Sequence, residues 1–303
     1  MTKRLKRLIY PVGSWFFLFL GLLFRRLSRK SALSLGRMLG IFVYSCLKIR
    51  RDLVLENLTC SFPEKTRADI DNIARKVYQN QALNIIELLR IPLIKNKKDA
   101  QELVSMHVDE GFQPILKNKQ GAVVVSGHFG SWETIGLCTG LMLKPMNFIV
   151  KPIKNKYLDI YLNHLRTMHG NKVIEANNAL RAGINALKRG EIVVILADQS
   201  QRKVSHYIDF LGRKTSVFLG PGFLALKSGV PLFVEVPRRT KDDHYQLKII
   251  EVKTSDLTCH KEDILELVKR YHFILEQFIR KHPEEWLWLH NRWKRSPKNA
   301  SRA

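Results

Sequence analysis

The sequence predicts an α/β fold: a mostly parallel central sheet flanked by helices, with a membrane-anchoring helix at the N-terminus. Short apolar runs typical of buried strands lie at 121–126, 147–151, 191–197 and 230–236. Stretches with helical periodicity separate them, at 131–144, 156–169 and 177–189. Strands that alternate with helices indicate βαβ units, and therefore parallel pairing. Residues 244–253 alternate between apolar and polar types, which predicts an antiparallel edge strand.

The N-terminal segment predicts an anchor over residues 1–30. An apolar run at 8–24 lies between two clusters of Lys and Arg. Crossing a bilayer takes roughly 17–25 apolar residues, so the run is at the short limit. The pair Arg25-Arg26 stands where a signal peptide would need small residues for cleavage, which favours an uncleaved anchor. Because basic residues flank both ends, a spanning helix and a helix dipped into one leaflet both fit.

The remaining residues, 31–303, predict a single α/β domain whose first part, 31–98, is helical. Thr66 follows a Pro-containing break and can cap a helix in which Asp69 is the third residue. Apolar residues continue at helical spacing to Arg90, and a final amphipathic helix is expected at 262–281.

The charge of the chain is strongly one-sided. It holds 51 Lys and Arg against 27 Asp and Glu, a net charge of +24. Such a chain suits an anionic partner: nucleic acid, anionic lipid, or an acidic carrier protein or phosphorylated cofactor. Twelve of the basic residues and a single acid, Asp52, fall within residues 1–54, which favours a membrane surface. The four cysteines are scattered, so neither a zinc site nor a disulfide framework is indicated.

The segment "VVVSGHFGSWETIGL" at 123–137 carries the first candidate for chemistry. His128 follows a predicted buried strand, and Glu133 falls in the first turn of the next predicted helix. A carboxylate beside an imidazole raises its basicity and orients it, as a general base requires. The spacing alone is weak, because a chain with ten histidines contains such a pair by chance. A capping glutamate beside a structural histidine is the alternative reading.

A family resemblance strengthens the catalytic reading. "SGHFGSWE" resembles the His-x4-acid block of the glycerolipid and lysophospholipid acyltransferase superfamily. The chain as a whole is similar to one branch, the late (secondary) acyltransferases of lipid A biosynthesis. The similar segments occur in order: "ENLTCSFPEKT", "IVKPIKNKYLDIYLNHLR", "ILADQS", "FLGRKTSVFLGPGFLALKSGVPL" and "PEEWLWLHNRWK". The resemblance implies transfer of an acyl chain from a thioester to a lipid hydroxyl, with His128 as base and Glu133 as its partner.

Other residues are candidates for substrate binding. Arg166 is expected to bind or stabilise charge, and Lys151 stands where the branch often has Arg. Asp198 and Gln199 end another predicted strand, where they would orient an acceptor sugar or hold the loop. Backbone N–H groups around Gly130 and Ser131 would stabilise the oxyanion of a tetrahedral intermediate. No metal or cofactor is expected, and the acyl donor is either acyl carrier protein or acyl-CoA.

The sequence therefore predicts a membrane-associated O-acyltransferase acting on a lipid A precursor. The resemblance implies a place at the bacterial inner membrane, with the catalytic part on the cytoplasmic side. A lysophospholipid or glycerolipid acyltransferase with the same His-Glu pair is the alternative. A basic, non-enzymatic binding protein leaves the ordered similar segments unexplained, and no nucleic-acid recognition motif is visible. A hydrolase is disfavoured because the Gly-x-Ser-x-Gly elbow is missing from the sequence.

Overall fold

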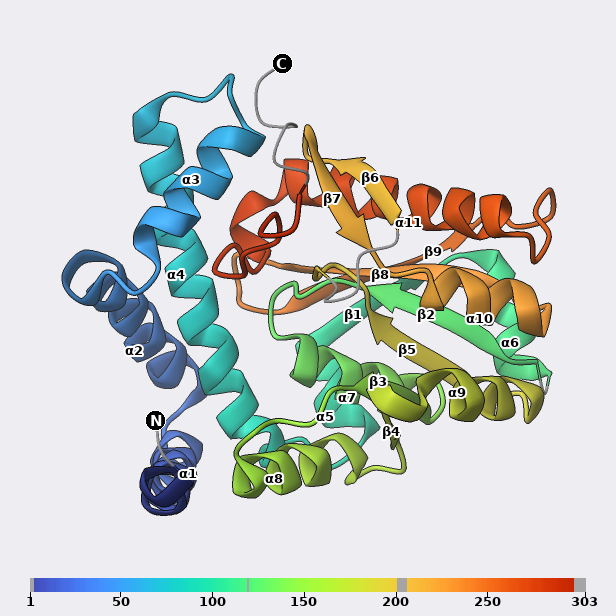
Figure 1. The fold of residues 1–303 in the computed structure, drawn as a ribbon. Helices are drawn as coiled ribbons and strands as arrows, with labels where there is room; N and C mark the ends of the chain where they lie inside the picture. The colour runs from blue at the N-terminus through green and yellow to red at the C-terminus, as the bar shows by residue number, and fades with distance from the viewer. Residues whose placement is uncertain (1–2, 119, 201–205, 297–303) are drawn as a thin grey trace.

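A seven-stranded sheet forms the centre of the molecule (Figure 1). The computed structural model describes residues 3–118, 120–200 and 206–296, with side chains from residue 10 onward. The strand order is β1-β9-β8-β2-β5-β3-β4. The strands are β1 (Val104–Val108), β2 (Ala122–Ser126), β3 (Met146–Val150), β4 (Lys172–Glu175), β5 (Ile192–Leu196), β8 (Leu232–Arg239) and β9 (Tyr245–Val252). Every pairing is parallel except that between β8 and β9, so the predicted mostly parallel sheet is confirmed.

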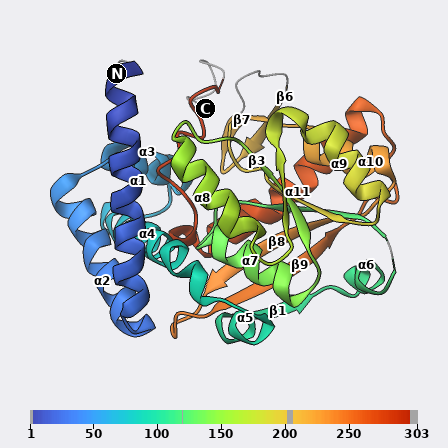
Figure 2. The same cartoon turned by 90° about the horizontal axis from the view of Figure 1, so that it is seen from below.

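Helices cover both faces of this sheet (Figure 2). One face packs against α9 (Ala179–Lys188), α10 (Gly220–Ser228) and α11 (Lys261–Lys281). The other packs against α5 (Lys97–Leu103), α6 (Gln113–Lys117), α7 (Trp132–Met142) and α8 (Lys156–Thr167). Buried Val123 and Val125 face the first group, whereas Ala122 and Val124 face the second. Because side chains alternate along a strand, β2 is apolar on both faces, as a central parallel strand requires.

A helical part precedes the sheet. It comprises α1 (Lys3–Arg26), α2 (Arg29–Phe42), α3 (Arg51–Ser61) and the long α4 (Arg67–Arg90). The predicted cap of α4 is present: Thr66 accepts a hydrogen bond from the backbone of Asp69, and the Asp69 carboxylate binds the Thr66 backbone in return. Helix α2 lies against α4, which in turn contacts α7 and the C-terminal segment. The α4 helix thus joins the helical part to the face of the sheet that carries the site.

The segment expected to be a membrane anchor, residues 1–30, forms helix α1 and the start of α2. Helix α1 packs along α4, with Phe17, Leu20 and Phe24 against the apolar cluster of α2 and α4. Its other side exposes large apolar side chains, namely Val12, Trp15, Phe16, Phe19, Leu22 and Leu23. Within the described residues no single helix is long and apolar enough to cross a membrane, although the bent pair 29–47 and 51–61 passes that test by length and composition.

The structure contains the strand predicted at the edge and several strands that the sequence pattern does not predict. The predicted strand at 244–253 exists as β9 and pairs antiparallel with β8, but β1 covers its outer side. Strands β1 and β4 are short and largely exposed, so neither has the apolar run that marks a buried strand. A two-stranded hairpin of β6 (His206–Phe210) and β7 (Arg213–Val217) lies outside the main sheet.

Candidate active site

The pairing of β2 with β5 brings the central residues of the site together. Ser126 at the end of β2 lies opposite Leu196 at the end of β5. The backbone N–H of Ala197 donates to the carbonyl of Ser126 at 2.9 Å, which extends the register by one residue. His128 and Asp198, each two residues beyond its strand, are therefore neighbours at the carboxyl edge of the sheet. Ligands of open α/β sheets bind at this edge.

Asp198 holds the imidazole of His128. One carboxylate oxygen lies 2.7 Å from His128 Nδ1, and the other accepts the His128 backbone N–H at 2.7 Å and the Trp286 indole N–H at 2.7 Å. The Asp198 side chain is only 2% exposed. Burial would raise its pKa, but the charge and hydrogen bonds of His128, with that of Trp286, hold the pKa well below its usual range. An ionised Asp198 keeps the proton on Nδ1 and leaves the lone pair of Nε2 free for chemistry.

The Gln199 side chain lies beside both nitrogens of the His128 ring. Its amide nitrogen is 3.1 Å from Nε2 and 3.5 Å from Nδ1. Because the lone pairs of the two ring nitrogens point in different directions, an atom close to both lies over the face of the ring. The in-plane lone pair of Nε2 is therefore open to a substrate hydroxyl.

Glu133, expected beside His128, is held by Arg166 instead. The Arg166 Nε donates to one Glu133 oxygen at 2.8 Å, and a second guanidinium nitrogen donates to the other. Among the described residues, Arg166 accounts for the hydrogen bonds of the Glu133 carboxylate, while Asp198 occupies the place expected for it on the imidazole. Although burial opposes the charge of Arg166, its hydrogen bonds to Glu133 raise its pKa. Both side chains are partly exposed, at 14% for Arg166 and 19% for Glu133, and both line the cavity beside His128.

The loop after His128 differs from the expectation that its backbone would stabilise an oxyanion. The N–H of Gly130 donates to the carbonyl of Glu285 at 3.0 Å, and that of Ser131 donates to the Tyr245 hydroxyl at 3.0 Å. Gly130 adopts a positive φ of 46° and lies close to the Tyr245 ring, so a side chain here would be both strained and crowded. These N–H groups therefore fix the loop rather than face a substrate.

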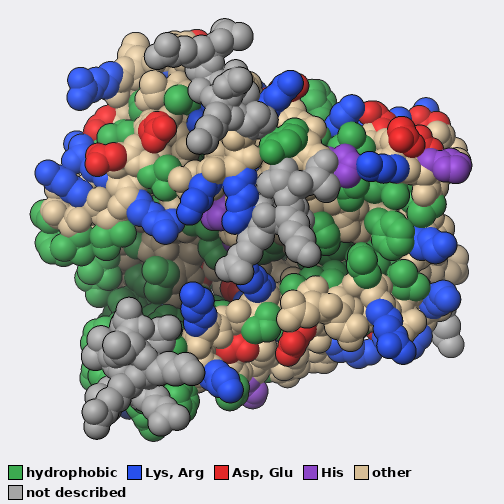
Figure 3. Space-filling model, viewed as in Figure 1, with side chains coloured by type: hydrophobic (Ala, Val, Ile, Leu, Met, Phe, Trp, Pro, Cys, Tyr) green, Lys and Arg blue, Asp and Glu red, His purple; other side chains and the backbone are tan. Residues whose placement is uncertain are grey.

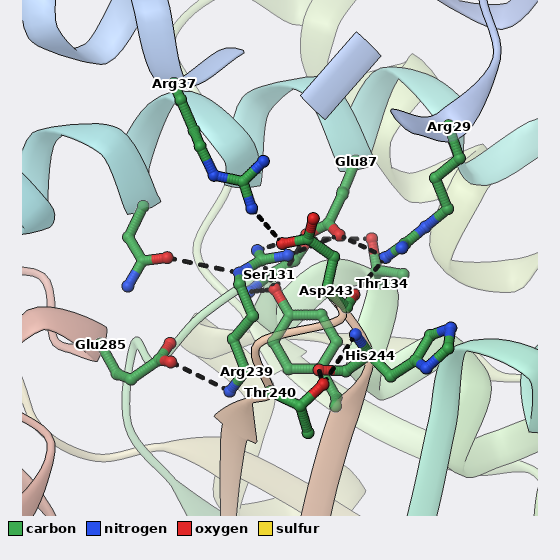
Figure 4. Close-up of polar contacts among 12 residues, drawn as sticks. Arg29, Arg37, Glu87, Ser131, Thr134, Arg239, Thr240, Asp243, His244 and Glu285 are labelled. Atoms are coloured by element: carbon green, nitrogen blue, oxygen red, sulfur yellow. Dashed lines mark hydrogen bonds and ion pairs between the residues drawn. The ribbon is translucent and has the colours of Figure 1, made fainter. Parts of the chain in front are cut away.

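A network of polar side chains from α4, β8, β9 and the C-terminal segment holds the loop after His128 in place (Figure 4). The Tyr245 hydroxyl donates to Glu87 of α4 at 2.8 Å, and Arg239 of β8 binds the same carboxylate at 2.9 and 2.7 Å. The backbone N–H of Arg239 donates to Glu285 at 2.9 Å. Arg29 of α2 reaches Glu87 at 3.1 Å, so the helical part and the sheet meet at this carboxylate, and Arg239 links it to Glu285 of the C-terminal segment.

A cavity of about 640 Å³ opens beside these groups. It lies between α7 and the sheet, and its walls include Ile135, Leu137, Phe148, Val194 and Leu196. Its volume falls within the roughly 300–1,000 Å³ typical of ligand pockets. Exposed Lys151 stands at its edge. Figure 3 shows a hollow between the helical part and the sheet, with Lys and Arg side chains around it.

The aromatic C-terminal segment turns out to be packed. Trp286 is 2% exposed and Trp288 is fully buried, and the two rings contact edge to face. The backbone N–H of Leu287 donates to the His128 carbonyl at 3.1 Å, and Phe129 forms a bridge with Trp286. The segment thus supports the histidine loop. The alternation of Trp with basic residues at 286–294 suits a membrane interface and a packed segment equally well, so the sequence alone leaves this role open.

Fold and site together define an acid–base centre at the carboxyl edge of an α/β sheet, with a His–Asp pair beside an apolar cavity. Among the described residues, no group of three or more His, Cys, Asp and Glu side chains could hold a metal ion.

Comparison with known proteins identifies the family. Residues 1–295 match the bacterial lipid A biosynthesis acyltransferase family, so the chain belongs to it and is an acyltransferase. It is 26% identical over 271 residues to the lipid A biosynthesis lauroyltransferase of Escherichia coli, covering 88% of this chain and 86% of that protein. The lipid A biosynthesis palmitoleoyltransferase of the same organism is 25% identical with the same coverage. The phosphatidylinositol mannoside acyltransferase of Mycobacterium tuberculosis is 22% identical over 68% of this chain and 66% of that protein.

Proposed function

We propose that the chain transfers a fatty acyl group from a thioester to a hydroxyl of a lipid A precursor, with His128 as the general base. The observation that carries this proposal is the orientation of His128. Its Nδ1 is bound by a buried carboxylate, which leaves Nε2 as the nitrogen open to substrate, and the residue lines the cavity. Family membership supports the lipid A acceptor.

The reaction follows from this orientation. Nε2 takes the proton of the acceptor hydroxyl as its oxygen attacks the thioester carbonyl carbon. Asp198 stabilises the imidazolium that forms, because its carboxylate remains ionised. The tetrahedral oxyanion then collapses, the C–S bond breaks, and the imidazolium returns its proton to the departing thiolate. The products are an ester and a free thiol.

Gln199 is our candidate for oxyanion stabilisation. Its side-chain nitrogen lies over the His128 ring, 3.1 Å from Nε2, so it is beside an acceptor hydroxyl bound to Nε2. The amide N–H is then next to the attacked carbonyl, where it donates to the developing negative charge. The backbone N–H groups of Gly130 and Ser131 are engaged elsewhere and do not compete for this role.

Charged groups at the cavity are proposed to bind the anionic parts of the substrates. Lysine at position 151 offers a point charge at the edge, which suits phosphate. Arg166 and Glu133 form a pair in the cavity wall, and we propose that Arg166 orients the acceptor while Glu133 holds the guanidinium in place. The role of Glu133 is then positional. Acyl carrier protein and coenzyme A are both anionic, and the net charge of +24 suits either donor.

We propose that the exposed apolar side of α1 lies in the membrane interface. Trp15, Phe16 and Phe19 are each more than half exposed, and α2 adds further exposed apolar side chains such as Met38 and Phe42. Basic residues border these helices, which favours the anionic inner leaflet of a bacterial inner membrane. The catalytic part would then lie on the cytoplasmic side, where thioester donors are made.

The central test is acyl transfer in vitro with His128→Ala. We expect the purified wild-type protein to add an acyl group to a lipid A precursor from acyl-carrier-protein or coenzyme A thioesters, and the variant to lose at least 99% of this rate. Mass spectrometry of the extracted lipid would detect the added acyl mass. His107→Ala, which changes an exposed histidine of β1, is the matched control and should keep its activity. Retained turnover in the His128 variant would refute the mechanism.

A lysophospholipid or another glycolipid is the alternative acceptor. The relatives named for phosphatidylinositol mannoside acylation keep this possibility open. The same assay distinguishes the acceptors, because the acyl mass appears either on the lipid A precursor or on the lysophospholipid when both are supplied together.

A further inference from the structure

Glu235 is a carboxyl group that the proposed reaction leaves unused. It lies in β8, opposite Ser126 of β2, and lines the cavity beside His128. The residue is only 5% exposed. Among the described residues its side chain has neither a hydrogen bond nor an ion pair, while the hydrogen bond from Ser126 goes to its backbone carbonyl at 2.7 Å. A buried carboxyl group without a partner is costly, so its presence in the cavity wall requires an explanation.

The position of Glu235 in the sheet indicates which part of a bound acyl chain it would contact: the carbons nearest the thioester. Strand residues rise about 3.3 Å each, so the level of Glu235 and Ser126 lies roughly 7 Å before that of His128. The cavity continues past this level to Val194, which pairs with Val124 two residues deeper in the sheet, and to Phe148. Glu235 and Phe148 lie on opposite sides of β2, because β8 flanks β2 on one side and β5 and β3 follow on the other. In an acyl chain with its carbonyl at His128 and its tail toward Phe148, the first carbons are therefore the part nearest Glu235.

We propose that Glu235 forms a subsite that selects acyl donors carrying a hydroxyl group on carbon 2 or carbon 3. This inference rests on the proposed function. A chain hydroxyl supplies the hydrogen bond that the carboxyl lacks, whereas a plain hydrocarbon leaves it buried and unpaired. Sites built to hydrogen-bond a substrate hydroxyl discriminate strongly against the analogue without it, because the buried polar group of the protein is then left unsatisfied.

The surroundings of Glu235 agree with this role. Burial raises its pKa to about 7, and no charged neighbour offsets the effect. The carboxyl group is thus readily protonated, and in either form it bonds a hydroxyl: the neutral acid donates or accepts, and the carboxylate accepts. Lys151, which lines the same cavity, remains available for the anionic parts of the substrates.

The test compares kcat/KM for matched twelve-carbon thioesters with a plain chain, a hydroxyl on carbon 2, a hydroxyl on carbon 3, and a hydroxyl on carbon 12. We expect the wild-type protein to prefer the carbon-2 or carbon-3 hydroxy donor over the plain one at least tenfold, and the carbon-12 donor to gain nothing. Glu235→Leu should remove or reverse the preference, whereas Glu235→Gln, whose amide still donates and accepts, should keep most of it. Circular dichroism of each variant would confirm that the fold is intact.

Val194→Ala is the matched control, because it changes the apolar wall of the same cavity. It should alter the rates with plain and hydroxylated donors in parallel. Equal kcat/KM for plain and hydroxylated chains in the wild-type protein, or a preference that survives in Glu235→Leu, would overturn the inference while leaving the proposed function intact. Loss of transfer from every donor in the wild-type protein would instead count against the proposed function itself.

Discussion

At the scale of single residues, the partner of His128, our proposed general base, is Asp198, two residues beyond the end of the neighbouring strand β5. Asp198 accepts three hydrogen bonds, two from His128 and one from Trp286. A carboxylate that is buried and fully hydrogen-bonded holds an imidazole in one tautomer and one orientation. Glu133 is engaged with Arg166, so the two carboxylates of the site serve different groups.

We therefore predict that Asp198→Asn is severely impaired in catalysis. The amide keeps the shape of the side chain but offers an N–H to Nδ1, which favours the tautomer whose Nε2 is already protonated. We expect kcat to fall roughly 10²–10⁴-fold, with little change in KM, in steady-state kinetics. Asp256→Asn, at a surface ion pair with Arg270, is the control and should have normal kcat. Normal turnover in Asp198→Asn would remove Asp198 from the mechanism.

At the scale of elements, the loop from β2 to α7 is fixed by segments that are distant in sequence. Tyr245 of β9 accepts the Ser131 N–H and donates to Glu87 of α4, while the carbonyl of Glu285 accepts the Gly130 N–H. The loop therefore depends on the junction of the helical part with the sheet.

Tyr245→Phe tests this dependence. Removal of the hydroxyl leaves the buried Ser131 N–H unpaired, which should cost about 1–3 kcal/mol in the free energy of unfolding. We also expect a drop in kcat, because the loop that carries His128 loses the hydrogen bond that holds Ser131 in place. Tyr271→Phe is the matched control: Tyr271 is a buried tyrosine whose hydroxyl binds a backbone carbonyl elsewhere. Denaturant unfolding and initial rates measured together would separate the effects, and unchanged kcat in Tyr245→Phe would contradict the positioning role.

At the scale of the whole molecule, the helical part presents an exposed apolar side, and a hollow bordered by Lys and Arg side chains lies between this part and the sheet (Figure 3). The inner sides of α1 and α2 pack on α4. Their outer sides are the surface that we propose to lie in the membrane interface.

The double variant Trp15→Glu/Phe19→Glu should weaken membrane association at least tenfold. Burying a large apolar side chain contributes roughly 1.5–3 kcal/mol, and both residues lie on the exposed side of α1. Flotation with phosphatidylglycerol vesicles would measure the bound fraction. Phe273→Glu, which changes a 63% exposed phenylalanine on α11, is the control and should float like the wild-type protein. Equal flotation of all three proteins would exclude α1 as the membrane-binding element.

The sequence by itself determined the alternation of strands and helices, the place of His128 at a strand end and the family resemblance, because each depends on local pattern. Only the tertiary structure decided which carboxylate meets the imidazole. Glu133 is near His128 in the chain, but the register of β2 with β5 places Asp198 there, seventy residues later. The occupied N–H groups of the loop, the packed side of α1 and the unpaired carboxyl group of Glu235 likewise arise from contacts between distant segments, which no local pattern encodes.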